Sequence, residues 1–360
     1  MKKYKVCVYA ICKNEEKFVE RWVNSMKEAD SIYVLDTGSS DNSVELLKSF
    51  GVNVQSKEIK PFRFDTARNL SLDMVPEDCD ICVCTDLDEV FESGWREKLE
   101  EIWNDDVTRV AYNYNWSFDK YGNPSVNFYI EKIHKRFGYS WKHPVHEVLV
   151  TNNKEKKVTT DEITLNHYPD SKKSRSSYLP LLELSVKEDE SDDRNMHYLG
   201  REYMYYGKWN EAIDTLIRHL NLKSATWKDE RCASMRFISR CYIALNRYEE
   251  AKMWLDKAMK EAPYLRDAYV ERSLLEYKLE NWDKVVKYSE EALLIKFHTK
   301  SYINEPFSFD NTIYDLLSVA YFYLNEYEKA LKNAKIALEM DNSDERIKNN
   351  IKIIERKITK

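Results

Sequence analysis

Two kinds of hydrophobic pattern divide the chain near residue 180. Before that point, short apolar runs rich in β-branched residues alternate with segments whose apolar residues recur at helical spacing. Residues 5–11, 31–35 and 81–85 are runs of the first kind, and residues 16–28 form a segment of the second kind. Short apolar runs favour buried strands, and helical spacing favours amphipathic helices that pack on a sheet. This strand–helix–strand rhythm predicts an α/β domain built around a parallel sheet.

Beyond residue 180 the strand pattern stops and an internal helical repeat begins. A small apolar residue recurs, and an aromatic residue stands three positions before it each time, at Trp209/Ala212, Tyr248/Ala251, Trp282/Val285 and Tyr327/Ala330. This spacing is typical of tetratricopeptide (TPR) repeats, which are helix pairs that bury a continuous core when about three or more of them stack. We therefore predict an α/β domain over residues 1–178 and an all-α, TPR-like domain of about four repeats over residues 179–360.

Composition narrows the function classes. The chain has 360 residues, enough for two cores, and its formal net charge of −6 does not favour a nucleic-acid partner. No apolar run approaches the roughly 18 residues of a transmembrane helix, and the N-terminus lacks the apolar segment of a secretory signal. The seven cysteines lie mostly in apolar runs, which favours buried thiols in a reducing compartment over disulfides or a zinc site. We expect a cytoplasmic protein without a transmembrane segment.

Residues 81–89 carry the densest candidate chemistry in the first half of the chain. An apolar strand runs directly into Asp86, Asp88 and Glu89. In an open α/β sheet the ligand crevice lies at the carboxyl ends of the strands. Carboxylates held close together repel one another, and Mg²⁺ or Mn²⁺ prefers such oxygen ligands and shares them with phosphates. A solvated acidic loop is the alternative interpretation of an Asp-x-Asp motif by itself.

The usual glycine-rich phosphate loops are missing. The chain has neither Gly-x-Gly-x-x-Gly after its first strand nor Gly-x-x-x-x-Gly-Lys-Ser/Thr. This argues against a dinucleotide-dependent dehydrogenase and against a P-loop NTPase. A phosphate group would then be bound through a metal ion, which favours the metal-site interpretation of the Asp-x-Asp motif.

Four motifs in the first hundred residues jointly resemble a known family. They are Lys13-Asn14-Glu15-Glu16, Asp36-Thr37-Gly38-Ser39-Ser40-Asp41, Thr66-Ala67-Arg68-Asn69 and Thr85-Asp86-Leu87-Asp88-Glu89. In this order they resemble the family 2 glycosyltransferases, whose GT-A fold is a Rossmann-like domain that binds a nucleotide sugar. The resemblance implies a UDP-sugar donor and a Mg²⁺ or Mn²⁺ ion.

The same resemblance assigns roles to individual residues. It implies that Asp36 contacts the uracil, that Arg68 lies against the base or diphosphate, that Asp86 approaches the ribose and sugar, and that Asp88 binds the metal. We place Lys13, Glu15 and His146 in the donor site as well.

Two further segments offer a base and another metal ligand. The loop that contains His146 and Glu147 resembles a His-Glu pair that faces the acceptor in these enzymes, and an inverting transfer needs one general base. Glu147 is the expected base, and Asp119, which lies in a turn-forming loop, is the second candidate. Alternatively, Glu147 orients His146 or pairs with Arg136. By resemblance, His167 reaches the metal or the diphosphate, and a structural hydrogen-bonding role is the alternative.

The expected function is an inverting, metal-dependent transfer of a hexose from a UDP-sugar, with UDP-glucose as the first choice of donor. A helical solenoid offers a long concave surface that suits an extended peptide. The chain in this respect resembles the bacteriocin S- or O-glycosyltransferases, so a Cys, Ser or Thr side chain of a peptide or protein is the expected acceptor. Alternatives are a cell-envelope enzyme that acts on a glycan or glycolipid, a non-catalytic TPR scaffold, and a homodimer formed through the repeats.

Overall fold

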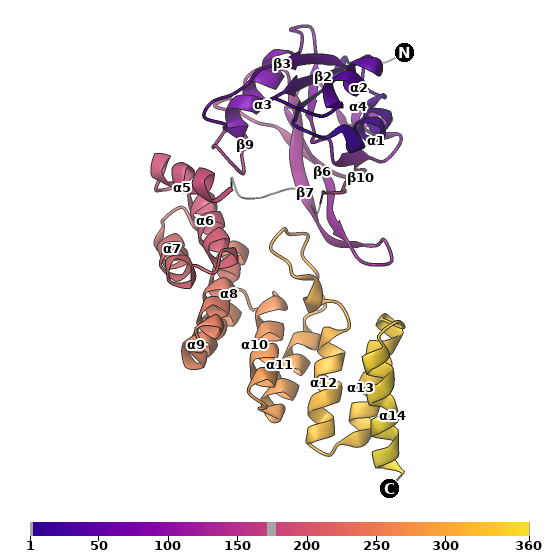
Figure 1. Cartoon of the computed structure of the whole chain (residues 1–360), viewed down its shortest axis with the longest axis vertical. Coiled ribbons are helices and arrows are strands. Elements are labelled where there is room, and N and C mark those ends of the chain that lie inside the picture. The colour runs from indigo at the N-terminus through magenta and orange to yellow at the C-terminus, as the bar shows by residue number, and fades with distance from the viewer. Residues whose placement is uncertain (1–2, 171–177, 360) are drawn as a thin grey trace. The chain divides into compact units, whose positions relative to one another are not determined.

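The structure is a computed structural model that describes residues 3–170 and 178–359. The chain divides into two compact units, which are residues 1–188 with 300–302 and residues 189–299 with 303–360. We call them the N-terminal unit and the repeat unit (Figure 1).

The N-terminal unit is built on a mixed sheet. Within the described residues its eight strands follow the order β3-β2-β1-β4-β7-β6-β10-β5. The strands of this sheet are β1 (Val6–Cys12), β2 (Ser31–Asp36), β3 (Asn53–Ser56), β4 (Ile81–Cys84), β5 (Glu89–Phe91), β6 (Arg109–Phe118), β7 (Pro124–Lys135) and β10 (Lys157–His167). Two short strands, β8 (Ser140–Lys142) and β9 (Val148–Val150), pair with each other as a separate antiparallel ribbon.

Strand direction corrects one expectation. Strands β3, β2, β1 and β4 are parallel, as the sequence pattern predicts. Strand β7, in contrast, runs antiparallel to both β4 and β6, and β5 runs antiparallel to β10. The turn at residues 119–123 is too short for a crossover connection, so it reverses the chain into a β6–β7 hairpin. The sheet is therefore mixed and not wholly parallel.

Helices cover both faces of the sheet. They are α1 (Glu16–Met26), α2 (Ser43–Ser49), α3 (Phe64–Asp73) and α4 (Trp95–Ile102), and α5 (Tyr178–Glu188) ends the unit. Alternate residues of β1 enter two separate cores, because successive strand residues point to opposite faces. Val6, Val8 and Ala10 pack in a core with residues of α1 and α4, whereas Cys7 and Tyr9 pack in a core with residues of α3 and β8. Burial on both faces explains why these strands are almost continuously apolar.

The repeat unit consists of stacked helix pairs. In the described part of the chain there are four pairs followed by one further helix: α6 (Asp193–Tyr205) with α7 (Trp209–Asn221), α8 (Lys228–Ala244) with α9 (Tyr248–Glu261), α10 (Asp267–Lys278) with α11 (Trp282–Leu294), α12 (Thr312–Tyr323) with α13 (Tyr327–Met340), and α14 (Glu345–Ile358). A 3-10 turn, η1 (Pro306–Ser308), precedes α12. The aromatic residue of the sequence repeat opens the second helix of every pair, and the small residue three positions later is fully buried each time. The repeat predicted from spacing is therefore confirmed as an all-α array.

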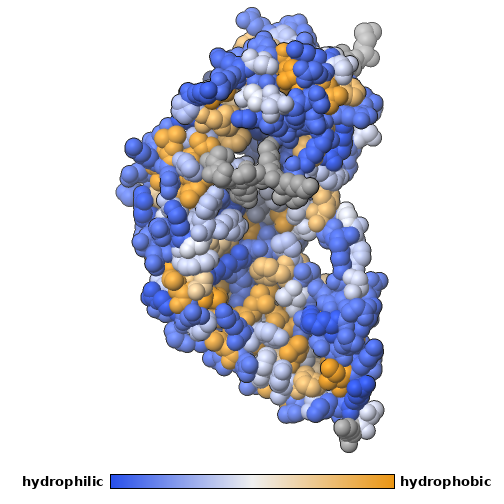
Figure 2. Space-filling model, in the orientation of Figure 1, coloured by the Kyte–Doolittle hydropathy of each residue, from blue (hydrophilic) through white to orange (hydrophobic). Residues whose placement is uncertain are grey.

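The surface mixes polar and apolar side chains. On the face drawn in Figure 2 hydrophilic and hydrophobic residues are interspersed. Among the described residues, no helix combines the length and the apolar character that crossing a bilayer requires.

Gly200 lies at a close approach between the two helices of the first repeat. It lies in the middle of α6, where an added Cβ would stand 2.5 Å from Cγ of Leu216 and 3.3 Å from its backbone nitrogen. The second and third repeats carry serine at the same position of the pattern. Ser239 and Ser273 donate to the carbonyl oxygens of Ala251 and Val285, at 2.9 and 3.2 Å. The first pair has no such space for a side chain.

We predict that Gly200→Ala lowers the free energy of unfolding by about 1–3 kcal/mol, because overpacking outweighs the better helix propensity of alanine. Urea denaturation would measure the change. The exposed neighbour Glu211 supplies the control, since Glu211→Ala should stay within about 0.5 kcal/mol of wild type. A Gly200→Ala protein that is more stable than wild type would show that the helices are free to move apart.

Candidate functional site

The site lies at the carboxyl edge of the parallel strands. Cys12, the last residue of β1, is in register with Asp36 at the end of β2. On the other side of β1, Tyr9 is in register with Cys84, the last residue of β4. The polar segments that follow these three strands therefore leave the sheet at one common edge, as expected for a ligand-binding crevice.

Arg68 connects two of the predicted site residues. It projects from α3 and is only 3% exposed. Its Nη2 donates to Oδ1 of Asp86 at 2.5 Å, and its Nε donates to Oε1 of Glu147 at 2.9 Å. The guanidinium carbon also lies 5.6 Å from the ring centroid of Trp141. One buried guanidinium thus fixes two carboxylates from distant parts of the chain, which charge-assisted hydrogen bonds do strongly.

Lys132, on β7, supplies a second cation that the sequence reasoning missed. Its Nζ lies 3.1 Å from Oδ2 of Asp86 and 3.1 Å from Oε1 of Glu89. Burial opposes ionisation of Asp86, but Arg68 and Lys132 outweigh it and hold the pKa of Asp86 well below its ordinary value. Burial also works against the charge of Lys132, and here Asp86 and Glu89 raise its pKa. In the sequence, Lys132 follows Glu131 in a strand of mixed polarity, so the local pattern did not single it out.

Glu89 lies beneath the Asp-x-Asp loop and supports it. The side chain is 1% exposed, and burial raises its pKa. Its Oε2 accepts from the backbone N–H of Asp86 at 2.8 Å, and its Oε1 accepts from the hydroxyl of Tyr114 at 2.8 Å. Through these contacts Glu89 holds the backbone of the loop at Asp86.

Asp88 and His167 are brought together by strand pairing. Strand β5 follows the loop directly, and its Glu89 is in register with His167 of β10. Oδ2 of Asp88 lies 3.5 Å from Nε2 of His167. The other ring nitrogen, Nδ1, lies 3.1 Å from the carbonyl oxygen of Trp116. A carbonyl can only accept, so Nδ1 carries hydrogen and Nε2 is the nitrogen that faces Asp88.

The surroundings of His167 hold this arrangement. The ring of Trp116 stacks on the imidazole with centroids 4.3 Å apart, and the backbone N–H of Tyr168 donates to the carbonyl of Asp88 at 2.8 Å. Burial would lower the pKa of His167, but Asp88 reverses this and raises it.

Asp36 and the first motif shape two neighbouring loops. Asp36 is buried, and its carboxylate accepts from the backbone N–H of Ser39 at 3.0 Å and of Gly38 at 3.3 Å. Asn14, which has a left-handed φ of 57°, accepts from the backbone N–H of Ser40 at 2.7 Å. The two loops are thereby joined at the sheet edge. In the first loop, Lys13 is exposed and Glu15 is buried.

The loop that carries His146 and Glu147 is docked on α3. Asn69 holds the strand before the loop by two reciprocal hydrogen bonds with the backbone of Trp141, at 2.9 and 2.8 Å. The carbonyl of Pro144 accepts from the N–H of Phe64 at 3.0 Å. His146 has a left-handed φ of 50°.

The ion-pair partner of Glu147 differs from the one we considered. It is Arg68, whereas Arg136 donates from Nε to the carbonyl oxygen of Val75 at 3.0 Å. Arg136 thus serves the backbone at the end of another segment, and the Glu147 carboxylate belongs to the Arg68 cluster.

Asp119 lies in the turn between β6 and β7. Its Oδ1 accepts from the backbone N–H groups of Tyr121 and Asn123, each at 2.8 Å, and hydrogen bonds from Asn123 lower the pKa of Asp119. These contacts are typical of a turn-forming aspartate. They stay within its own turn, whereas Arg68, Asp86 and Glu147 contact one another directly.

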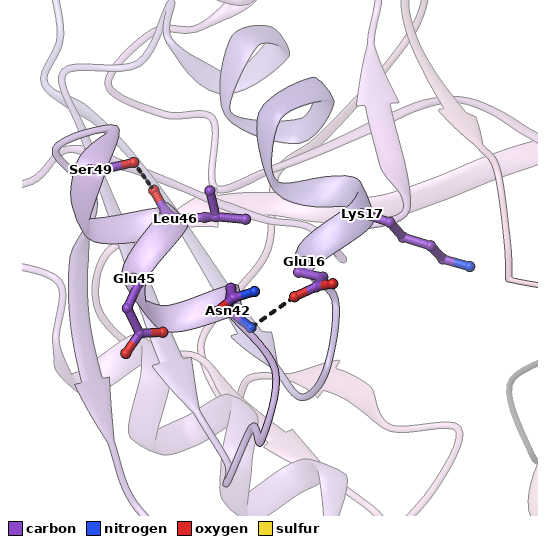
Figure 3. A pocket seen from close by; sticks show the side chains of 6 residues that line it. All are labelled: Glu16, Lys17, Asn42, Glu45, Leu46 and Ser49. Carbon is purple, nitrogen blue, oxygen red and sulfur yellow. Dashed lines mark hydrogen bonds between the residues drawn. The ribbon is translucent and has the colours of Figure 1, made fainter.

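A separate cavity of about 540 Å³ borders α1 and α2 (Figure 3). Its lining comprises Glu16, Lys17, Asn42, Glu45, Leu46 and Ser49. Glu16 points toward Asn42 and accepts from its backbone N–H at 2.8 Å, while Lys17 points away. None of the lining residues is a predicted site residue, so the cavity is not part of the candidate site.

Comparison with protein families gives a match for the first part of the chain. Residues 7–161 match the family model described as glycosyl transferase family 2. No curated protein matches the chain.

Solved structures resemble the chain only in fold. The crystal structure of MamA is 20% identical with a TM-score of 0.38, covering 50% of this chain and 99% of that chain. A thermophilic TPR protein of Thermus thermophilus is 20% identical with a TM-score of 0.36, covering 50% of this chain and 89% of that chain. The helix pairs described above, and not these distant similarities, define the repeat unit.

We predict that Lys132→Met destabilises the protein by about 3–5 kcal/mol, because it leaves buried carboxylates without one of their cations. Thermal or urea unfolding at neutral pH would measure the loss. Lys157 provides the matched control, because it pairs with Glu131 at 2.8 Å on the surface and is 42% exposed. Lys157→Met should cost no more than about 1 kcal/mol. Equal effects of the two substitutions would contradict the structural role of Lys132.

Proposed function

Because residues 7–161 form a family 2 glycosyltransferase domain, we propose that the protein transfers a hexose from a UDP-sugar to a Cys, Ser or Thr side chain of a peptide or protein. UDP-glucose is the first donor to test, and the transfer is metal-dependent and inverts the anomeric centre. The single observation that carries the proposal is the convergence of Asp86, Arg68 and Glu147, next to the Asp88–His167 pair, at the carboxyl edge of the sheet.

The pair Asp88 and His167 fits a divalent cation. A carboxylate oxygen and an imidazole nitrogen face each other at 3.5 Å, and the second ring nitrogen is fixed by the carbonyl of Trp116. Metal-ligating histidines usually donate their other N–H to such an acceptor. Imidazole is a better ligand for Mn²⁺ than for Mg²⁺, which makes Mn²⁺ the first ion to test. When bound, such a cation supplies stabilisation of the negative charge that develops on departing UDP.

Asp86 and Arg68 would bind the donor. Arg68 and Lys132 keep Asp86 ionised, and an ionised carboxylate accepts hydrogen bonds from ribose and sugar hydroxyls. Arg68 carries a permanent positive charge near the position proposed for the diphosphate. Asp36 would contact the uracil at the next strand end, with the loops that carry Lys13, Glu15 and His146 around the nucleotide.

Glu147 is the proposed general base. Arg68 engages Oε1, so Oε2 is the oxygen that would take the proton from the acceptor thiol or hydroxyl. The acceptor sulfur or oxygen forms its bond to the anomeric carbon while the bond to the diphosphate oxygen breaks and UDP leaves with the electron pair. Attack from the face opposite UDP gives inversion.

The repeat unit supports a peptide acceptor. It exposes aromatic and aliphatic side chains that a peptide could cover, including Tyr206, Trp227, Tyr264, Tyr277, Leu294 and Phe297. Aromatic residues are the usual anchors of protein interfaces. A glycan or glycolipid acceptor is the second candidate. The exposed side chains of the repeat unit could alternatively form the interface of a homodimer.

The test is to incubate the protein with UDP-glucose and Mn²⁺, with and without peptides that contain Cys, Ser or Thr, and to measure UDP release and the peptide mass. We expect release of UDP and a peptide mass increase of one hexose. Transfer to a glycan or glycolipid alone would replace the peptide proposal. Failure with every UDP-sugar and acceptor would remove the transferase proposal.

We predict that Asp88→Ala reduces metal-dependent UDP release by at least about 100-fold, because the cation loses its carboxylate ligand and with it several kcal/mol of charge stabilisation. The rate should be measured across a Mn²⁺ titration. Asp106→Ala, which removes an aspartate that is 77% exposed, serves as the control and should behave like wild type. A full rate in Asp88→Ala would exclude Asp88 as the metal ligand.

We predict that Glu147→Gln lowers kcat for transfer by about 10²–10⁴-fold, since the amide keeps the shape of the side chain but cannot take a proton. Donor binding, measured as the Kd for UDP, should change little. Asp119→Asn is the decisive comparison. If this substitution removes transfer and Glu147→Gln does not, Asp119 is the base.

A further inference from the structure

The first three helices of the repeat unit bring together a second group of potential metal ligands. Asp193 opens α6, His219 lies near the end of α7, and Glu230 lies in the first turn of α8. One ligand atom from each residue lies within 4.8 Å of the other two. None of the three belongs to the proposed transferase site, and the inference below does not depend on the proposed function.

The imidazole of His219 is fully buried and points its Nε2 into this group. Nε2 lies 3.4 Å from Oε1 of Glu230. Within the described residues, this nitrogen has no partner that satisfies hydrogen-bond geometry, although the side chain is 0% exposed. Buried polar atoms are almost always satisfied, so an exception that lies among potential metal ligands points to an ion there.

The other ring nitrogen of His219 is held by Ser234. The Ser234 hydroxyl lies 2.9 Å from Nδ1 of His219 and 2.7 Å from Nδ1 of His197. A hydroxyl has one hydrogen, so it can donate to only one of the two rings, and the other ring must donate to it. We assign the hydroxyl hydrogen to Nδ1 of His197, which leaves Nδ1 of His219 as the donor to the Ser234 oxygen.

With that assignment, His219 carries its hydrogen on Nδ1 and presents the lone pair of Nε2 to Glu230, and Asp193 belongs to the same group of ligand atoms. A lone pair that faces a carboxylate is repelled unless a cation lies between the two. Metal-ligating histidines show a similar pattern, because a protein group usually fixes one ring nitrogen while the other faces the metal site.

The spacing suits a tetrahedral ion. Ligands at about 2.0–2.1 Å from Zn²⁺ are roughly 3.4 Å apart when the coordination is tetrahedral. The distance between Nε2 of His219 and Oε1 of Glu230 is 3.4 Å. Imidazole nitrogen and carboxylate oxygen both bind Zn²⁺, and a site with three protein ligands keeps its fourth position for water.

We propose that Asp193, His219 and Glu230 bind a divalent transition-metal ion of the Zn²⁺ class. The ion joins α6, α7 and α8, so it fixes the packing between the first and second repeats. Its ligands are separate from those of the cation proposed at Asp88.

The experiment uses the full chain carrying Asp88→Ala and His167→Ala, so that the N-terminal site is removed. After dialysis against a chelator, Zn²⁺ is titrated by calorimetry and by thermal unfolding. We expect one equivalent to bind and the Tm to rise by about 5–10 °C when zinc exceeds its Kd 100-fold. Adding His219→Gln or Asp193→Asn should weaken zinc binding by at least about 10-fold. Asp214→Asn, which changes an exposed carboxylate on α7, should leave it unchanged.

A spectroscopic readout keeps the proposal testable if a variant fails to fold. In protein labelled with ¹⁵N-histidine, zinc should shift the Nε2 signal of His219 and leave its Nδ1 protonated. Nε2 that carries hydrogen both with and without zinc would identify a His–carboxylate hydrogen bond and overturn the proposal. So would stoichiometric zinc binding that persists in both His219→Gln and Asp193→Asn.

Discussion

The arrangement of the candidate site depends on the burial of one guanidinium. Taking the charge of Arg68 out of water costs several kcal/mol, and the structure offsets this cost with Asp86, Glu147 and the carbonyl of Thr85. These partners belong to the end of β4 and to the loop before β9, so the ion pairs fix both segments against α3. Asn69, the next residue in α3, adds two hydrogen bonds to the strand that precedes the same loop. A single turn of α3 thus positions both the proposed donor site and the proposed base.

The charges around Arg68 explain why a cation belongs at this edge. Arg68 and Lys132 are the two cations of the cluster, against the four carboxylates Asp86, Asp88, Glu89 and Glu147. The formal charge of the cluster is therefore negative, and a nucleoside diphosphate would add further negative charge. A divalent ion at Asp88 would reverse this balance locally, since a bound cation is often the largest charge in such a site. Asp86 stays ionised because Arg68 and Lys132 both contact it, and it is thereby available to hydroxyl groups.

The sequence predicted the strands, helices and repeats that rest on local periodicity. Strands β1, β2 and β4 and the aromatic residue at the start of each second repeat helix could be located because apolar spacing directly reports burial. What could not be predicted depends on long-range pairing. The contact of Lys132 with Asp86 requires β7 to run antiparallel beside β4, and the Glu147–Arg68 pair joins residues 79 positions apart.

The start of α3 shows that the role of a residue can be unpredictable from sequence even over a short distance along the chain. Aspartate and threonine are common helix caps, but neither Asp65 nor Thr66 caps α3, because the helix begins at Phe64. The Asp65 carboxylate instead accepts from the guanidinium of Arg63 at 3.0 and 2.8 Å. A capping aspartate and an aspartate paired with a nearby arginine have the same local sequence, so only the folded arrangement distinguishes them.

The repeat unit buries polar groups for a different reason. Stacked repeats contact only their neighbours, so apolar packing alone allows adjacent pairs to slide. Hydrogen bonds between buried polar groups are directional, so they favour one arrangement of neighbouring pairs. His197, His219 and Ser234 act in this way between the first two repeats, and Arg236 with Glu271 does so between the second and third. These interior contacts set the register of the array.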